Sequence, residues 1–167
     1  ASLARCHPDD IEQAWEAIKV AKDSRIHVFT STSQIHMEHM LRKSKEEVLN
    51  DAKESVRYAK KLCDNIEFSA QDATRTDKDF LIEVLKVAVE EGATTINVPD
   101  TVGYATPQDY LDLLKSVYEE VKGGNEDVII STHCHNDLGL AVANSLTAIT
   151  AGARQIEGAI NLSLIHI

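Results

Sequence analysis

The sequence is poor in cysteine, and its few cysteines are not arranged as a structural framework. Only three occur among 167 residues, at Cys6, Cys63 and Cys134. Their number is odd, they lie far apart in the sequence and they form no Cys-x-x-Cys pair. This pattern predicts reduced thiols rather than disulfides, and therefore a cytoplasmic protein.

Long hydrophobic runs and an excess of basic residues are missing as well. No segment approaches about 18 consecutive apolar residues, so no membrane span is predicted, and no basic region followed by an apolar run marks a signal peptide. The net charge is −10, from 27 acidic and 17 basic residues, which argues against nucleic acid and anionic membranes as partners. An anionic substrate stays compatible with this charge, because a local site can be positive inside an acidic protein.

What the sequence does contain is an alternation of short apolar runs with longer amphipathic stretches. The amphipathic stretches carry apolar residues at spacings of three and four, and capping patterns such as Ser44 with Glu47 precede them. Helices are predicted at 8–22, from 45 to 63, at 77–91, at 106–123 and at 136–151, and strands at 25–30, 65–69, 94–98, 127–132 and from 154 to 158.

This strict alternation without hairpin signals predicts a parallel sheet with helical crossovers. The sheet is either an open doubly wound sheet or part of a (β/α)₈ barrel. The barrel is favoured because each strand ends in a polar cluster, and barrel active sites are assembled at that rim from several strands. A complete barrel needs roughly 250 residues, so the 167 residues predict a partial one.

The sharpest candidate for chemistry is the pair His133 and His135. Side chains two residues apart on a strand point the same way, so two imidazoles can reach one divalent ion. The alternative is a pair of polar rim histidines without a metal. A metal site usually needs a third ligand, often a carboxylate, and it must come from another strand, because we expect Asp137 to cap the following helix.

A second candidate lies at the end of the strand predicted at 94–98, where Asn97, Pro99 and Thr101 alternate on one face. Asn and Thr side chains there suit a small anionic substrate, whereas the alternative is a strand–loop turn in which they satisfy backbone groups. His27, inside an apolar strand, is more typical of a hydrogen-bonded core residue than of a catalyst.

A third candidate is the stretch from Glu67 to Thr76. Glu67 sits in an apolar strand, where a carboxylate is costly unless it is paired or functional. Arg75 suits a phosphate or carboxylate ligand, or it is a structural partner of Asp72.

Taken together, these clusters resemble the 2-isopropylmalate synthases of the isopropylmalate and homocitrate synthase family. The resemblance is carried, in order and at similar spacing, by residues 26–33, 67–76, 95–104 and 131–141, and it runs from about residue 3 to residue 161. It implies a partial (β/α)₈ barrel, from about the third strand to the start of the eighth, over residues 1–161. Residues 162–167 depart from the family and look like an atypical tail after a truncation or junction, in which His166 is not a ligand.

The resemblance also implies roles for individual residues. His133 and His135 fall on two metal ligands of the family, and the implied metal is divalent zinc, manganese or magnesium. The family's 2-oxo acid pocket corresponds to His27, Ser69, Asn97, Pro99 and Thr101, with Arg5 as a further candidate at the rim. Thr101 is expected to bond the substrate carboxylate.

The candidate catalytic residues are Glu67 and Gln71. Gln71 occupies a position where the family is expected to have Glu, and an amide cannot replace a carboxylate in proton transfer. A second departure is the absence of the family's first two strands, which carry the third metal ligand, an Asp, and a catalytic Arg.

The implied activity is a metal-dependent condensation of acetyl-CoA with 2-oxoisovalerate in leucine biosynthesis, by an acyltransferase whose full-length form is a homodimer. In this reaction a base removes a methyl proton from acetyl-CoA, the enolate adds to the keto carbon, and hydrolysis of the thioester drives the reaction forward. The alternatives are a homocitrate or citramalate synthase of the same family, or a non-catalytic relic that keeps the barrel motifs.

Overall fold

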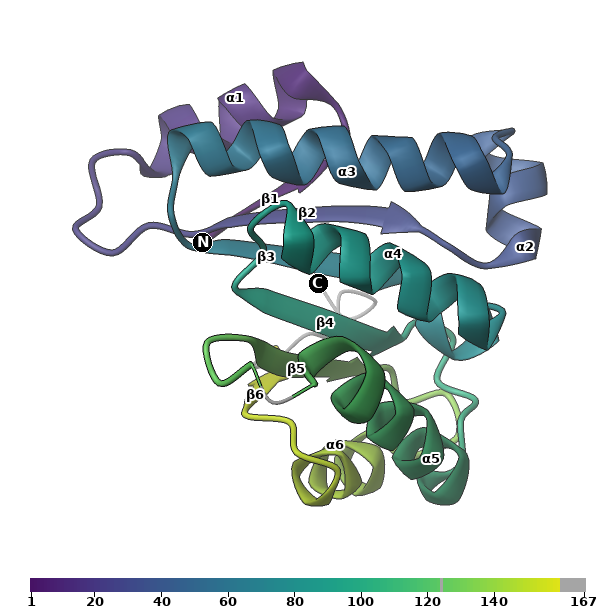
Figure 1. Ribbon diagram of the computed structural model, residues 1–167. Coiled ribbons are helices and arrows are strands. Elements are labelled where there is room, and N and C mark those ends of the chain that lie inside the picture. Colours follow the sequence, from purple (N-terminus) through teal and green to yellow (C-terminus); the bar gives the residue numbers. More distant parts are fainter. Residues whose placement is uncertain (124, 160–167) are drawn as a thin grey trace, which may run out of the picture.

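Six parallel strands in chain order form the sheet of the computed structural model, which describes residues 1–123 and 125–159 (Figure 1). The strands are β1 (Ser2–Arg5), β2 (Ile26–Ser31), β3 (Ile66–Gln71), β4 (Thr95–Asp100), β5 (Ile129–Cys134) and β6 (Gln155–Glu157). Each pairs in parallel with the next, so the predicted parallel α/β architecture is confirmed.

Helices connect the strands and return the chain to the start of the next one. They are α1 (Pro8–Ile18), α3 (Lys45–Leu62), α4 (Lys78–Glu90), α5 (Pro107–Val117) and α6 (Ala141–Thr150), with the short α2 (Gln34–His36), the π-helical turns Met37–Leu41 and Tyr118–Lys122, and the 3₁₀ turn Ala73–Arg75. The predicted capping box is present, because Ser44 and Glu47 bond each other's backbone N–H groups. Among the residues described, no helix is long and apolar enough to cross a membrane.

Contacts across the inner face show that the sheet is strongly curved. Strands β2 and β6 are four positions apart, a separation of about 19 Å in a flat sheet. Nevertheless, the Arg25 side chain, just before β2, donates to Gln155 Oε1 on β6 at 2.6 Å. The sheet therefore bends into an open partial barrel, as predicted, and the helices cover its outer side (Figure 1).

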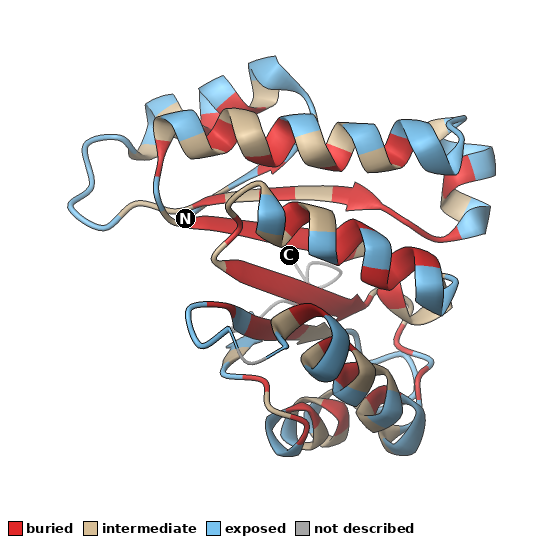
Figure 2. Cartoon of the chain, viewed as in Figure 1, coloured by how far each residue is buried: buried red, intermediate tan, exposed pale blue. Residues whose placement is uncertain are grey.

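The pleat divides the strand residues between an apolar outer face and a polar inner face. Residues facing the helices are almost fully buried and form the core with α1, α3, α4 and α5; they include Ile26, Val28, Ile66, Phe68, Ile96, Val98 and Ile130. Figure 2 shows the buried strands between helices whose outer sides are exposed. Because register fixes the face of every residue, the odd-numbered positions of β2 to β6 all point inward.

Two predicted helices are shorter than expected. Helix α1 ends at Ile18 instead of Lys22, since the chain turns there to run back toward β2. Helix α6 begins at Ala141 rather than at 136, because Gly139 has a φ of 73°, a left-handed conformation that no α-helix can contain.

The expected cap of α6 is also wrong. Asp137 does not cap the helix; the Asn136 side chain instead accepts a hydrogen bond from the Ala141 backbone N–H at 3.1 Å. Asp137 is exposed and packs close to Gly103 in the loop after β4.

A substitution of Tyr110 tests how the packing of α5 against the sheet is stabilised, because this side chain is 0% exposed between them. Its hydroxyl donates to the Val98 carbonyl at 2.5 Å and is also hydrogen-bonded to Thr132. Tyr110→Phe leaves both groups buried without this partner, so we expect the free energy of unfolding in urea to fall by about 1–3 kcal/mol.

The matched control is Tyr104→Phe, at a tyrosine that is 49% exposed. Its hydroxyl bond to the Thr74 carbonyl is 3.3 Å long, and solvent can replace it, so we expect a change below about 0.5 kcal/mol. Equal losses in the two variants would contradict the role given to the Tyr110 hydroxyl.

Candidate active site

The inner face of the half-barrel contains a cavity of about 470 Å³ at the carboxyl ends of the strands. The predicted catalytic, substrate and metal residues that line it are His27, Ser69, Gln71, Asn97, Pro99, Thr101, His133 and His135. The structure thus brings eight of the ten predicted site residues to one cavity, from four neighbouring strands or the loops just after them. Two others, Arg5 and Glu67, do not line it.

Arg5 lies at the rim in an adjoining hollow of about 730 Å³. Its side chain is 75% exposed and is paired with Asp10 on α1, with Nε 2.5 Å from the carboxylate. The two hollows meet at Phe29 and Gln71, which line both. Arg5 therefore borders the cavity without facing the other predicted residues.

Glu67 lies deeper, on the floor of the half-barrel, and is 2% exposed. Arg25 donates to its Oε2 at 2.9 Å and Gln155 to its Oε1 at 2.8 Å. Both carboxylate oxygens are thus engaged by neighbouring side chains, which favours a structural role over direct catalysis. Sequence reasoning identified the costly carboxylate but neither of its partners, because Gln155 is 88 residues away in the chain.

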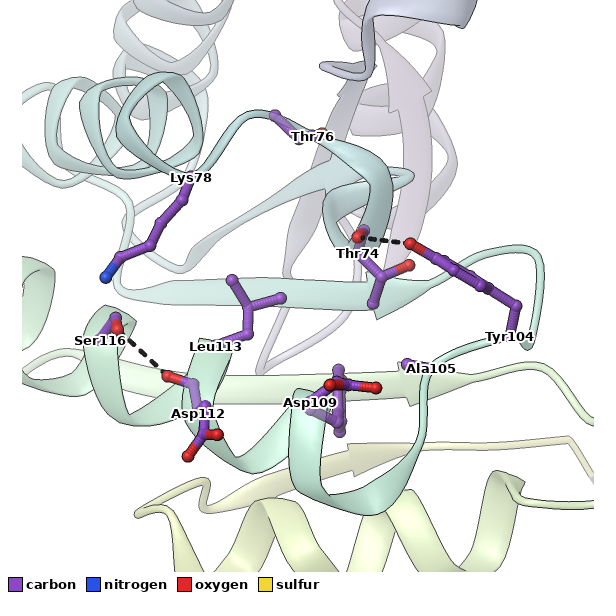
Figure 3. Close-up of a pocket in the computed structure, with 10 residues that line it drawn as sticks. Thr74, Thr76, Lys78, Tyr104, Ala105, Asp109, Asp112, Leu113 and Ser116 are labelled. Carbon is purple, nitrogen blue, oxygen red and sulfur yellow. Dashed lines mark hydrogen bonds between the residues drawn. The ribbon is translucent and has the colours of Figure 1, made fainter.

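A third hollow, of about 360 Å³, lies outside the sheet between the start of α4 and α5 (Figure 3). Tyr104 donates there to the Thr74 carbonyl at 3.3 Å, and Ser116 to the Asp112 carbonyl at 3.1 Å, as Figure 3 shows. None of the predicted site residues reaches it. We therefore place the candidate active site in the inner cavity.

A continuous chain of hydrogen bonds orients three of the cavity residues. Asn97 Nδ2 donates to Ser69 Oγ at 2.8 Å, and Ser69 Oγ is 2.6 Å from His27 Nε2. Ser69 Oγ accepts from Asn97 and is also hydrogen-bonded to Nε2 of the ring, so it fixes the orientation of the His27 side chain. Burial lowers the pKa of His27, which keeps the ring neutral at physiological pH.

The floor of the cavity holds a pair of carboxyl groups, Glu67 and Glu157. Burial and the hydrogen bond shared with Glu67 raise the pKa of Glu157 to about 8. Burial works in the same direction on Glu67, but hydrogen bonds with Glu157 and Gln155 and the nearby charge of Arg25 act against it, and the pKa of Glu67 is lowered. Glu67 is thus the ionised partner of Arg25, and Glu157 holds the proton near neutrality.

Two groups of side chains have the chemistry to hold a divalent metal. His133 and His135 have ring centroids 5.0 Å apart at the mouth of the cavity. His133 Nδ1 is buried and has no hydrogen-bond partner within the described ranges. Burial, and then the neighbouring His135, lower the pKa of His133, which favours the neutral form that binds metals.

The second group is His27, Glu67 and Glu157, whose nearest ligand atoms all lie within 4.8 Å of one another. Arg25 already supplies a positive charge 2.9 Å from Glu67, and Ser69 occupies His27 Nε2. A metal there would have to compete with this cation, so the histidine pair fits an ion better. Glu157 was not predicted as a site residue from the sequence. The strand β6 has only three residues, so Gln155 and Glu157 are too few to show an alternating pattern.

Comparison with known proteins relates the chain to one family. The sequence pattern of the HMGL-like family matches residues 1–161. The 2-isopropylmalate synthase of Clostridium kluyveri is 57% identical over 159 residues, which cover 95% of this chain and 31% of that protein. The 2-isopropylmalate synthase of Pelotomaculum thermopropionicum is 54% identical over 161 residues, 96% of this chain and 32% of the relative. The chain thus spans about a third of the length of these curated relatives.

Among solved structures, the chain superposes on the HMG-CoA lyase of Bacillus subtilis with a TM-score of 0.78 and 22% identity, covering 93% of this chain and 51% of the lyase. The HMG-CoA lyase of Acinetobacter baumannii, solved with coenzyme A and 3-methylmalate, gives a TM-score of 0.76 at 19% identity, over 95% of this chain and 51% of that one. At this level of identity the likeness establishes the fold alone.

The carboxyl pair on the floor predicts an unusual dependence of stability on pH. Glu157 has a folded-state pKa of about 8, above its ordinary value of 4.5. The folded state therefore holds a proton that the unfolded chain releases, so this group's contribution is present below pH 4.5 and is lost as the pH rises toward about 8. Glu157→Gln removes this loss, and we expect it to be more stable than the unmodified chain at pH 8 by about 1–3 kcal/mol.

The control is Glu67→Gln, which removes the ionised partner of Arg25 and leaves a partly buried positive charge, since the Arg25 side chain is 22% exposed. We expect it to lower the free energy of unfolding by about 3 kcal/mol at neutral pH. The measurement is urea unfolding of the unmodified chain, Glu157→Gln and Glu67→Gln between pH 5 and 8. If Glu157→Gln followed the same pH curve as the unmodified chain, the proton on Glu157 would be ruled out.

Proposed function

The chain belongs to the HMGL-like family, and from this premise we propose that it forms part of the active site of a 2-isopropylmalate synthase. Such an enzyme is an acyltransferase that condenses acetyl-CoA with 2-oxoisovalerate and serves leucine biosynthesis. The observation that carries the proposal is the convergence of eight predicted site residues on one cavity at the carboxyl ends of the strands. Barrel enzymes hold their catalytic groups at this end.

The hydrogen-bond donors that line the cavity suit the proposed 2-oxo acid, whose polar atoms are all oxygen acceptors. Thr101 Oγ1 accepts the Asp72 backbone N–H at 2.9 Å, so its own hydrogen is free to bond a carboxylate. Pro99 and Phe29 supply apolar contacts for an alkyl group at the wall of the same cavity. The size of the cavity, about 470 Å³, is in the range of small-molecule sites.

In the proposed enzyme, His133 and His135 hold a divalent ion such as zinc, manganese or magnesium. The buried, unpartnered Nδ1 of His133 supports this assignment. When bound, such an ion supplies Lewis acidity that polarises a carbonyl. The residues of this chain bind and orient the substrate: Thr101 faces its carboxylate, and the chain of bonds from Asn97 through Ser69 holds the His27 ring in the wall.

The condensation removes a methyl proton from acetyl-CoA, joins the methyl carbon to the keto carbon, and hydrolyses the thioester to release free CoA. The alternatives of a homocitrate or citramalate synthase are less favoured, since the similar curated relatives carry the name 2-isopropylmalate synthase. We further propose that the full-length enzyme is a homodimer and that it is cytoplasmic, since Cys6, Cys63 and Cys134 are free thiols, as in a reducing compartment.

Metal binding tests the assignment of the histidine pair. Isothermal titration with zinc should show that His133→Ala and His135→Ala each weaken binding by at least about tenfold, because each removes one ligand. His39→Ala, at a histidine whose side chain is 77% exposed, is the control and should not change the affinity. If His27→Ala or Glu67→Gln abolished binding while His133→Ala had no effect, the metal would belong to the deeper group.

Activity is tested in a chimera, because the chain spans only 31% of the Clostridium kluyveri relative. Residues 1–159 of this chain replace the matching segment of that synthase. We expect the chimera to release free CoA from acetyl-CoA only when 2-oxoisovalerate is present. Introducing His133→Ala should reduce the rate by at least about a hundredfold.

The parent synthase and the His39→Ala chimera are the positive controls. A folded chimera that binds zinc but releases no CoA above background would count against the synthase proposal. It would favour instead a segment that keeps the barrel motifs without the activity.

A further inference from the structure

The two proposed metal ligands, His133 and His135, are held by the fold in different ways. His133 lies within β5 and is paired on both sides, with β4 and with β6. His135 lies just beyond the end of β5, past the last paired position of the sheet. It is exposed, its ring packs edge-on against His133, and that ring makes no hydrogen bond within residues 1–123 and 125–159. The position of the His135 imidazole therefore depends on what fixes its backbone.

The backbone of His135 is bonded to the turn that follows β4, here called the Asp100 turn (residues 100–103). The His135 N–H donates to the Asp100 carbonyl at 3.1 Å, and the Gly103 N–H donates to the same carbonyl at 3.3 Å. The Gly103 carbonyl in turn accepts the Leu138 N–H at 3.3 Å. The loop after β5 is thus bonded to the Asp100 turn at two points.

Asp100 is itself firmly anchored, since it is 0% exposed and both of its carboxylate oxygens are engaged. Its Oδ1 accepts from the Thr74 hydroxyl at 2.9 Å, and its Oδ2 accepts the Ala105 backbone N–H at 3.2 Å. These bonds come from the 3₁₀ turn after β3 and from the loop before α5. The residue whose carbonyl holds His135 is therefore fixed from two directions.

Gly103 is the closest point of approach between the Asp100 turn and the loop of His135. It has a φ of 61°, a left-handed conformation that favours glycine. A Cβ added at Gly103 would lie 2.8 Å from the Asp137 backbone nitrogen and 3.0 Å from the His135 carbonyl carbon, and it would collide with the Asp137 carboxylate. The exposed carboxylate can rotate away, but the two backbone atoms can yield only if the loop that carries His135 moves.

We propose that the Asp100 turn positions His135 for metal binding, and that Gly103 is the residue on which this positioning depends. The proposal rests on the proposed function, and it adds to the metal site a positioning residue that has no side chain to contact the ion. Ligands have to be held within about 0.5 Å of the productive geometry, so a displaced loop lowers the affinity for the metal. Thr101, the expected partner of the substrate carboxylate, belongs to the same turn, which therefore also sets its distance from His135.

Titration calorimetry of the full chain with zinc tests this role, and Gly139 provides a matched control. Gly139 has a φ of 73°, but a Cβ added there would meet nothing within 4 Å. Gly103→Ala and Gly139→Ala therefore both strain a left-handed residue, whereas only Gly103→Ala displaces the backbone next to His135. We expect Gly103→Ala to weaken zinc binding by at least about tenfold and Gly139→Ala by less than about twofold.

A second pair of variants guards against a failure to fold. Asparagine adopts the left-handed conformation more readily than alanine and carries the same Cβ. Gly103→Asn and Gly139→Asn should therefore repeat the contrast in zinc affinity with less strain. Thermal unfolding is measured for each variant, and zinc is titrated well below the lowest unfolding temperature.

A double-mutant cycle shows whether Gly103 acts through His135. In the His135→Ala background the ligand is already lost, so adding Gly103→Ala should weaken the residual zinc binding by less than about twofold. Asp137→Ala should also leave the zinc affinity within about twofold, because the effect of a Cβ at Gly103 is assigned to the backbone and not to this carboxylate.

The outcomes separate this inference from the proposed function. If the unmodified chain bound no zinc, the proposed metal site and the positioning role would both be contradicted. If zinc binding depended on His135 but was unchanged in Gly103→Ala and Gly103→Asn, the positioning role alone would be overturned. The same holds if the losses in Gly103→Ala and His135→Ala multiplied, or if Asp137→Ala reproduced the loss. A loss in the Gly103 variants that disappears in the His135→Ala background supports the proposal.

Discussion

The guanidinium of Arg25 joins the two sides of the curved sheet. It bonds Glu67 on β3 and Gln155 on β6, at 2.9 and 2.6 Å, across an interior that a flat sheet would not possess. This charge lets β3 carry a carboxylate that is 2% exposed, which would otherwise be prohibitively costly to bury. The polar floor, the curvature and the placement of the cavity above the floor all depend on this contact.

Hydrogen bonds that begin at the floor of the half-barrel orient the side chains of the cavity above it. Glu157 accepts from Asn97 at 3.2 Å, Asn97 donates to Ser69, and Ser69 fixes the ring of His27. Most polar groups in these links are bonded to their neighbours, although Asn97 Oδ1 is buried without a partner among the described residues. The groups that remain for a ligand include Thr101, His133 at the end of β5 and His135 just after it. The largely hydrogen-bonded floor and the more open rim distinguish the two ends of the half-barrel.

Much of this site was predictable, and the reason is the regular period of a strand. Asn97, Pro99 and Thr101, like His133 and His135, share a face because residues two apart on a strand point the same way. The cost of placing a carboxylate in an apolar strand predicted that Glu67 is paired or functional. The sequence did not reveal that Arg25, Gln155 and Glu157 surround it, since Gln155 and Glu157 lie on β6, which is not a neighbour of β3, and the contact with Arg25 joins residues 42 apart in the chain. Nor did it foresee that the side chain of Asn136, and not that of Asp137, accepts the first backbone N–H of α6, which depends on the left-handed turn at Gly139.

The sequence by itself determined the order of strands and helices, the parallel sheet and the polar ends of the strands, because these follow from periodicity, capping and local chain reversal. Only the tertiary structure decided how far the sheet curves, which oppositely charged groups meet across it, and which atom of the Gln71 amide bonds Ser31. Such properties depend on distances between residues far apart in the chain. A hydrogen bond such as that from Ser31 to Gln71 exists only once register brings the two strand ends together.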